Sequence, residues 1–169
     1  MSLPKIAVTT GDPAGIGPEV CLHLLQNEGI AAQCVPIIFG DRVVLEQAAD
    51  QCDLLKPQKY IAGLSEADGP CVLDMSAIGL DEFETGTVNA ATGRAGFVYV
   101  ENAIDAALGG QVAGVTTGPL NKEALRAAGI SFPGHTEIFC GENARATVLY
   151  DAILERSVLC VCDDARAVF

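Results

Sequence analysis

The residues best suited to chemistry lie between positions 116 and 137. The run T-T-G-P-L-N-K ends at Lys122, and F-P-G-H-T-E then presents His135 and Thr136 after a Pro-Gly turn. Hydroxyls, a lysine and a histidine between a strand and a helix suit an anionic substrate, because free backbone N–H groups and the helix dipole favour negative charge there. By spacing alone, the same residues also fit an ordinary strand-turn-helix unit with a surface histidine.

A second stretch of interest is the glycine-rich run V-T-T-G-D-P-A-G-I-G-P-E, from Val8 to Glu19. It lacks the G-K-[ST] ending of a P-loop, and its glycines do not fit the G-x-G-x-x-G spacing of a Rossmann dinucleotide site. Two interpretations stay open. The glycines let a strand turn closely into a helix, or the loop walls a substrate cleft into which Asp12 points.

The elements that must position these motifs alternate along the chain. Short apolar or β-branched runs predict strands at 6–10, 35–39, 71–73, 112–115, 146–150 and 157–162. Capping residues and apolar periodicity predict helices from Pro18 to about residue 26, after Asp41, from Gly93 to Leu108, and over 122–128 after Asn121. This alternation predicts an α/β fold with parallel strand pairing and helices on both faces of the sheet.

Length, composition and charge limit the classes of molecule that this protein can bind. The 169 residues are half apolar and include 18 glycines, which fits one α/β core. A net charge of −12 argues against nucleic acid and against an anionic membrane surface. An anionic metabolite therefore needs a local positive site, for which Lys122 is the candidate. We see neither a signal peptide nor a membrane-length apolar run, and we expect a cytoplasmic protein.

The seven cysteines are odd in number and scattered through apolar surroundings. Cys160 and Cys162 form the only close pair, and one intervening residue is not the spacing of a zinc knuckle or a redox motif. We therefore expect reduced thiols in the core.

The two motifs together support a more specific hypothesis. T-T-G-P-L-N-K with F-P-G-H-T-E, preceded by V-T-T-G-D-P-A-G-I-G-P-E, resembles the 4-hydroxythreonine-4-phosphate dehydrogenase family of pyridoxal phosphate biosynthesis. The resemblance implies a parallel-sheet α/β/α architecture of the isocitrate and isopropylmalate dehydrogenase type. It implies that residues 1–169 are a truncated, amino-terminal portion of a two-domain dehydrogenase, with 141–169 diverging from the family pattern.

The same resemblance implies an activity and a site. Family members are homodimers that use NAD and a divalent metal (zinc, magnesium or cobalt). They oxidise the secondary alcohol of 4-phosphohydroxy-L-threonine, and the product loses carbon dioxide. The implied substrate-binding residues are His135 and Thr136, and the implied pocket residues are Asp12, Thr117, Gly118 and Lys122.

The sequence departs from the family at the metal site. The family supplies three histidines beyond G-H-T-E, whereas this chain has only His23 and His135, and we expect His23 to be structural or on the surface. Asp163 and Asp164 are poor replacement ligands, since adjacent acidic residues at a chain end are usually solvated. The resemblance thus assigns neither a metal ligand nor a catalytic residue, and it predicts that this chain alone is inactive. A dehydrogenase of D-threonate or D-erythronate 4-phosphate, and a non-catalytic phosphate-metabolite-binding remnant, remain as alternatives.

Overall fold

The computed structural model describes residues 3–131 and the backbone of two further strands, 147–151 and 158–162. The strands are β1 (Lys5–Thr9), β2 (Val35–Gly40), β3 (Tyr60–Ile61), β4 (Cys71–Asp74), β5 (Gly114–Thr117), β6 (Thr147–Asp151) and β7 (Val158–Cys162). The helices are α1 (Gly17–Leu25), α2 (Glu28–Ala31), α3 (Arg42–Cys52), α4 (Ala90–Leu108) and α5 (Lys122–Ala127). Two short 3₁₀ turns cover Leu64–Glu66 and Leu80–Glu82.

The strands form one sheet in the order β3-β4-β2-β1-β5-β7-β6. The first five strands in this order pair in parallel, which confirms the predicted parallel sheet. β7 instead runs antiparallel to both β5 and β6. The segment between β6 and β7 spans only 152–157, which is too short for the helical crossover that parallel pairing requires.

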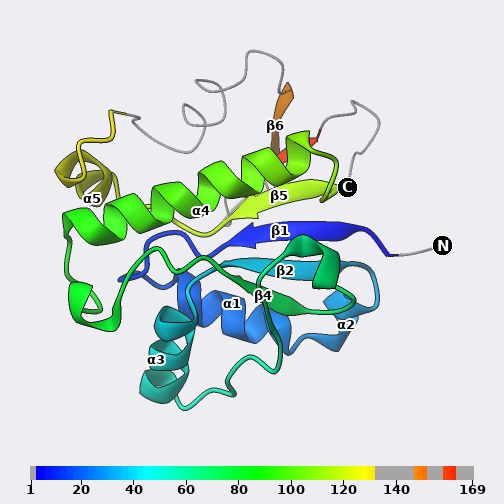
Figure 1. Cartoon of the computed structure of the whole chain (residues 1–169), viewed down its shortest axis with the longest axis horizontal. Coiled ribbons are helices and arrows are strands. Elements are labelled where there is room, and N and C mark those ends of the chain that lie inside the picture. The colour runs from blue at the N-terminus through cyan, green and yellow to red at the C-terminus, as the bar shows by residue number, and fades with distance from the viewer. Residues whose placement is uncertain (1–2, 132–146, 152–157, 163–169) are drawn as a thin grey trace.

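Alternate side chains of the central strands enter two separate cores. One core joins Ala7, Ile37 and Phe39 to Tyr99 and other residues of α4. The opposite core joins Val8, Ile38 and Val72 to residues of α1 and α3. In Figure 1, α4 and α5 lie on one side of the sheet and α1 and α3 on the other, which confirms helices on both faces.

Several predicted boundaries were wrong by a few residues. The strand expected at 112–115 is β5, Gly114–Thr117, so both threonines belong to it. Helix α4 begins at Ala90 and not at Gly93, because the Asn89 side chain accepts a hydrogen bond from the Thr92 N–H and caps the helix three residues earlier. Helix α2 and strand β3 were not predicted.

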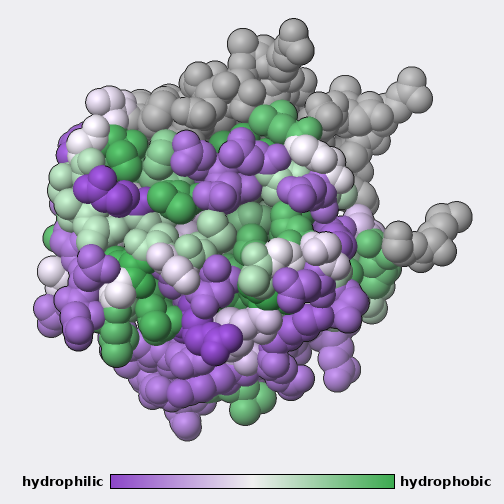
Figure 2. All heavy atoms as spheres, in the orientation of Figure 1, coloured by the Kyte–Doolittle hydropathy of each residue, from purple (hydrophilic) through white to green (hydrophobic). Residues whose placement is uncertain are grey.

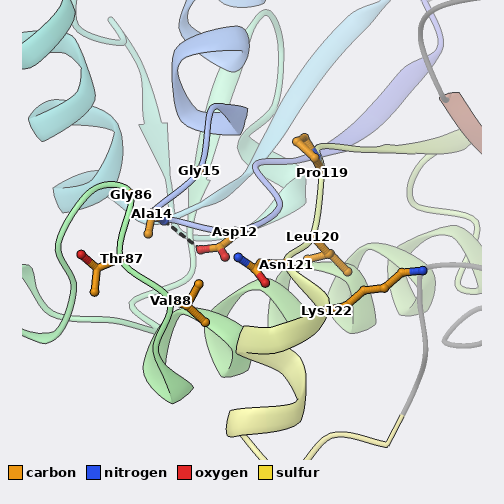
Figure 3. Close-up of a pocket in the computed structure, with 10 residues that line it drawn as sticks. All are labelled: Asp12, Ala14, Gly15, Gly86, Thr87, Val88, Pro119, Leu120, Asn121 and Lys122. Atoms are coloured by element: carbon orange, nitrogen blue, oxygen red, sulfur yellow. Dashed lines mark hydrogen bonds between the residues drawn. The ribbon is translucent and has the colours of Figure 1, made fainter.

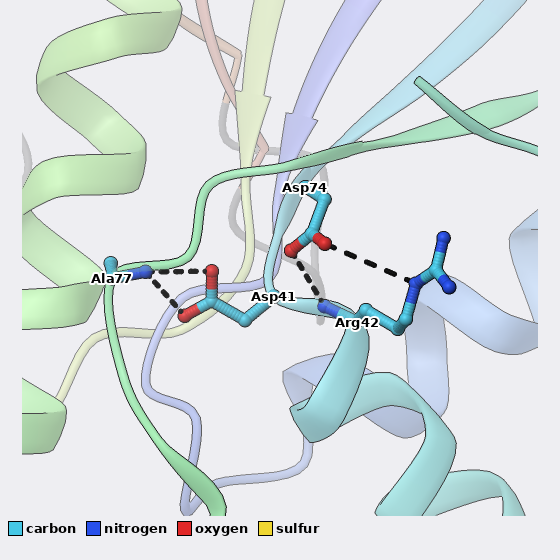
Figure 4. Close-up of polar contacts among 4 residues, drawn as sticks. All are labelled: Asp41, Arg42, Asp74 and Ala77. Atoms are coloured by element: carbon cyan, nitrogen blue, oxygen red, sulfur yellow. Dashed lines mark hydrogen bonds and ion pairs between the residues drawn. The ribbon is translucent and has the colours of Figure 1, made fainter. Parts of the chain in front are cut away.

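Asp41 occupies the predicted capping position before α3, but its carboxylate does not bond to that helix. It accepts hydrogen bonds from the N–H groups of Ala77 (2.9 and 3.0 Å) and Ile78 (2.8 Å) and from the Tyr99 hydroxyl (2.8 Å). The first N–H of α3, that of Arg42, donates to Asp74 of β4 at 3.1 Å (Figure 4). Asp41 therefore fixes the segment after β4 instead of capping α3.

The cysteine prediction holds for part of the described chain. The four cysteines with described side chains are free, and of these Cys21 and Cys71 are buried. Burial raises the pKa of Cys21 to about 12. Cys34 is half-buried and Cys52 is exposed at the end of α3, so these two are not core residues. The other three cysteines lie outside the residues with described side chains. Within the described residues, no helix has the length and apolar character to cross a membrane.

Candidate functional site

The chain leaves β1 and β5 in opposite directions. Beyond β1 it continues into α1 on one face, and beyond β5 into α5 on the other face (Figure 1). β1 and β5 are neighbours in the sheet, so their carboxyl ends diverge at a topological switch point. In open α/β sheets, ligands bind in the crevice at such a point.

A cleft of about 430 Å³ lies at this switch point. Figure 3 shows its walls, which come from three segments far apart in the sequence. These segments contribute Asp12, Ala14 and Gly15 after β1, Gly86, Thr87 and Val88 before α4, and Pro119, Leu120, Asn121 and Lys122 after β5.

Backbone hydrogen bonds tie the three segments together. The Gly118 N–H donates to the Thr9 carbonyl (2.8 Å), the Asp12 N–H to the Pro119 carbonyl (3.0 Å) and the Gly86 N–H to the Ala14 carbonyl (2.8 Å). These bonds join the walls of the cleft directly to one another.

The glycines of the run from Val8 to Glu19 make this geometry possible. Gly11 has φ of +73°, a conformation that side chains disfavour. At Gly17, an added Cβ would lie 1.7 Å from the Thr10 carbonyl oxygen, so only glycine lets α1 start this close to β1. The glycines therefore permit the tight turn, and the loop walls a cleft. That a substrate binds in this cleft stays a prediction.

Asp12 is the buried charged group of the cleft. It is 5% exposed, and its Oδ1 accepts a hydrogen bond from the Ala14 N–H at 2.9 Å. Burial raises the pKa of the Asp12 carboxyl, and the Ala14 N–H and the Thr92 hydroxyl partly oppose this effect. In Figure 3 the carboxylate points toward Ala14 and lies among the residues that line the cleft, and we call its position the floor of the cleft.

The start of α5, at the other end of the cleft, does not offer the free N–H groups that the sequence predicted. The Asn121 side chain accepts hydrogen bonds from the N–H groups of Glu123 (2.9 Å) and Ala124 (3.3 Å). These two first-turn N–H groups of α5 are therefore not free to bind an anionic substrate. The sequence had led us to expect free N–H groups here. Lys122 is exposed at the rim, and its side chain points away from Asp12 (Figure 3).

The remaining predicted residues fall in two groups. Thr117 and Gly118 are half-buried at the end of β5, immediately before the lining residues, but they do not line the cleft. His135 and Thr136 lie outside the described residues. The structure thus brings Asp12 and Lys122 to one cleft and places Thr117 and Gly118 beside it. His23 is exposed on α1, as expected.

The wall at 86–88 was missed by the sequence analysis. A usable signal was present, since Asn89 is a good N-cap residue and would have placed Gly86–Val88 directly before α4. No local pattern could show the hydrogen bond from the Gly86 N–H to the Ala14 carbonyl, which brings this loop to the glycine-rich run at residues 8–19.

Comparison with known proteins decides the family. A family model described as pyridoxal phosphate biosynthetic protein PdxA matches residues 32–159, which is more than half of the chain. The chain belongs to the PdxA family. The motif at residues 116–137 falls within the match, whereas the glycine-rich run at residues 8–19 precedes it. This membership confirms the resemblance and the fold class, an α/β fold of the isocitrate dehydrogenase type.

Individual PdxA relatives carry two different names. A candidate D-threonate 4-phosphate dehydrogenase of Symbiobacterium thermophilum is 42% identical over 140 residues, which cover 80% of this chain and 42% of the relative. A 4-hydroxythreonine-4-phosphate dehydrogenase of Trichlorobacter lovleyi is 33% identical over 142 residues, with the same coverage of both chains. The chain therefore spans less than half the length of these curated relatives.

A solved structure is also similar to this chain in fold and sequence. The crystal structure of a 4-hydroxythreonine-4-phosphate dehydrogenase from Burkholderia phymatum matches with a TM-score of 0.77 and 33% identity. The match covers 89% of this chain and 48% of that one. The similarity thus extends over nearly the whole of the present chain.

Proposed function

We propose that this chain supplies the substrate cleft of a dehydrogenase for a phosphorylated four-carbon hydroxy acid. The substrate is 4-phosphohydroxy-L-threonine. Its secondary alcohol is oxidised with NAD as hydride acceptor, and the resulting β-keto acid loses carbon dioxide, a reaction of pyridoxal phosphate biosynthesis. The observation that supports this most strongly is that segments of both family motifs line one cleft at the switch point of the sheet.

The cleft has two chemically different ends. Asp12 places a carboxylate on the floor, whereas Lys122 places an amine at the rim. A phosphate group is best accommodated at the Lys122 end, because a buried carboxylate repels it. His135 and Thr136 belong to the motif that follows α5, and we assign them to substrate binding as well.

The divalent metal of the proposed reaction is assigned to residues other than those described. Across residues 3–131, no group of three or more His, Cys, Asp or Glu side chains is placed to hold a metal ion. We propose that the 169-residue chain binds the substrate without turning it over. As the family resemblance implies, we also propose that the active protein is a homodimer.

D-Threonate 4-phosphate is the second candidate substrate. It has a hydroxyl group at C2 where 4-phosphohydroxy-L-threonine has an amino group. The relative from S. thermophilum, at 42% identity, carries this name and supports the alternative.

Calorimetric titration of the chain tests the proposal. We expect binding of 4-phosphohydroxy-L-threonine and at least tenfold weaker binding of unphosphorylated 4-hydroxy-L-threonine, since tenfold corresponds to about 1.4 kcal/mol, a modest value for a charged contact. His135→Ala should weaken the binding of the phosphorylated ligand. Equal affinity for the two ligands, or binding of neither, contradicts the proposal. NADH formation by the chain with substrate and metal contradicts the inactive state proposed for it.

A further inference from the structure

Asp12 differs from the other charged residue that lines the cleft. Lys122 is exposed and extends away from the floor, whereas Asp12 is 5% exposed and its carboxylate lies at the floor (Figure 3). The protein has a net charge of −12, so a buried anion here is not compensated by a generally basic surface.

The partners of Asp12 are neutral. The Ala14 N–H donates to Oδ1 at 2.9 Å, and the Thr92 hydroxyl lies close enough to oppose the effect of burial on the pKa. The ion pairs of the described residues involve Arg42, Lys56 and Lys59, each with another carboxylate. Within the described part of the chain, Asp12 therefore has no cationic partner.

A buried carboxylate without a counter-charge is costly, and its pKa rises accordingly. A ligand that brings a positive charge to this position removes part of that cost. A ligand that brings only a hydroxyl provides a hydrogen bond without neutralising the charge, so it gains less.

We propose that Asp12 is a specificity-determining residue that binds a protonated amino group of the ligand at the floor of the cleft. The inference rests on the proposed function and extends it. The favoured ligand is a phosphorylated amino acid with its phosphate toward the Lys122 end and its ammonium group against Asp12. A phosphorylated sugar acid, with hydroxyl in place of ammonium, is the disfavoured class.

A matched pair of ligands isolates this contact. One is 4-phosphohydroxy-L-threonine, and the other is its analogue with a hydroxyl replacing the C2 amino group at the same configuration. Asp12→Asn is the matched variant, since an asparagine oxygen can still accept the Ala14 N–H and keep the turn. Lys122→Gln is the control, because it removes a charge at the other end of the cleft.

The readout is the ratio of the two dissociation constants, measured by calorimetry on the full 169-residue chain. We expect the wild type to bind the amino ligand about tenfold or more tightly than the hydroxy analogue. Asp12→Asn should bring this ratio close to one. Lys122→Gln should weaken the binding of both ligands and preserve the ratio. A purely structural role of Asp12 would lower both affinities together.

The outcomes separate the two proposals. If both ligands bind and the ratio is the same in wild type and Asp12→Asn, the role of Asp12 is wrong and the proposed function stands. If the wild type favours the hydroxy analogue, the specificity is the reverse of the one inferred. If neither ligand binds the wild type, both proposals fail.

Discussion

At the scale of single residues, two buried carboxylates organise the carboxyl edge of the sheet. Asp12 and Asp41 follow β1 and β2, and both are buried. Burial raises the pKa of each carboxyl, while hydrogen bonds from backbone N–H groups oppose the rise. Both carboxylates are largely removed from water, and both accept hydrogen bonds from backbone N–H groups that hold a loop in place.

Removal of the Asp41 carboxylate should be strongly destabilising. Asp41→Ala leaves the Ala77 and Ile78 N–H groups and the Tyr99 hydroxyl without this acceptor, and we expect a loss of about 3 kcal/mol or more in the free energy of unfolding. Tyr99→Phe removes one donor and should cost about 1–2 kcal/mol.

Urea denaturation of the single and double variants measures both effects. In the Asp41→Ala background, Tyr99→Phe should be neutral or stabilising, because it deletes a hydroxyl that has lost its acceptor. Additive costs in the double variant would show that the two groups do not interact.

The raised pKa of Asp12 also sets the sign of a pH effect. The folded state binds this proton more tightly than the unfolded state, whose carboxyl titrates near pH 3.9. The cost of ionising Asp12 is fully present above the folded-state pKa and disappears as the pH falls toward about 3.9. The stability of the wild type relative to Asp12→Asn should therefore increase on acidification.

Asp68 provides a control of opposite sign. It is exposed and paired with Lys59, whose side chain lowers the pKa of the Asp68 carboxyl. The stabilisation from this pair is present above the unfolded-state pKa and is lost as the pH falls. The stability of the wild type relative to Asp68→Asn should thus decrease on acidification. Urea titrations from about pH 2.5 to 7 measure how the stability of each variant, relative to the wild type, changes with pH, because the Asp68 effect develops below about pH 3.9 and the Asp12 effect above it. Changes of the same sign would refute the assignment.

At the scale of elements, strands and helices were more predictable than the loops that form the cleft. β1 and β2 are buried parallel strands, so they appear in the sequence as short apolar, β-branched runs. Asn121 is an effective local cap and correctly marked the start of α5. The segment after β4 has no comparable local signal, because Asp41 fixes it from 36 residues away. The same limitation hid the cleft wall at 86–88.

The close approach of α1 to β1 gives a prediction at this scale. Gly17→Ala would place a Cβ 1.7 Å from the Thr10 carbonyl oxygen, so α1 and the cleft loop must shift. We expect a loss of about 2 kcal/mol or more in the free energy of unfolding, together with weaker ligand binding.

Gly69→Ala is the matched control, since an added Cβ there has no atom within 4 Å. It should leave stability within about 0.5 kcal/mol of the wild type. Thermal or urea unfolding of the two variants makes the comparison, and equal stability of both would mean that α1 can move away from β1 without cost.

At the scale of the whole molecule, the fold explains where the cleft lies. The parallel strands bring the ends of β1 and β5 together, and the helices that follow them diverge to opposite faces. The surface in Figure 2 is mixed, with polar residues over much of the visible face. The family could be inferred from the sequence because both motifs are long, whereas the way the chain joins them depends on tertiary hydrogen bonds.

The most direct test of whether this cleft is the substrate site is hydrogen exchange on the 169-residue chain with and without 4-phosphohydroxy-L-threonine. We predict that the ligand slows the exchange of amides in 12–15, 86–88 and 120–122, the segments that line the cleft. Helix α3, which lies outside the lining, should be unaffected and serves as the internal reference. Protection confined to other segments, or no protection at saturating ligand, would contradict the claim that this cleft is the substrate site.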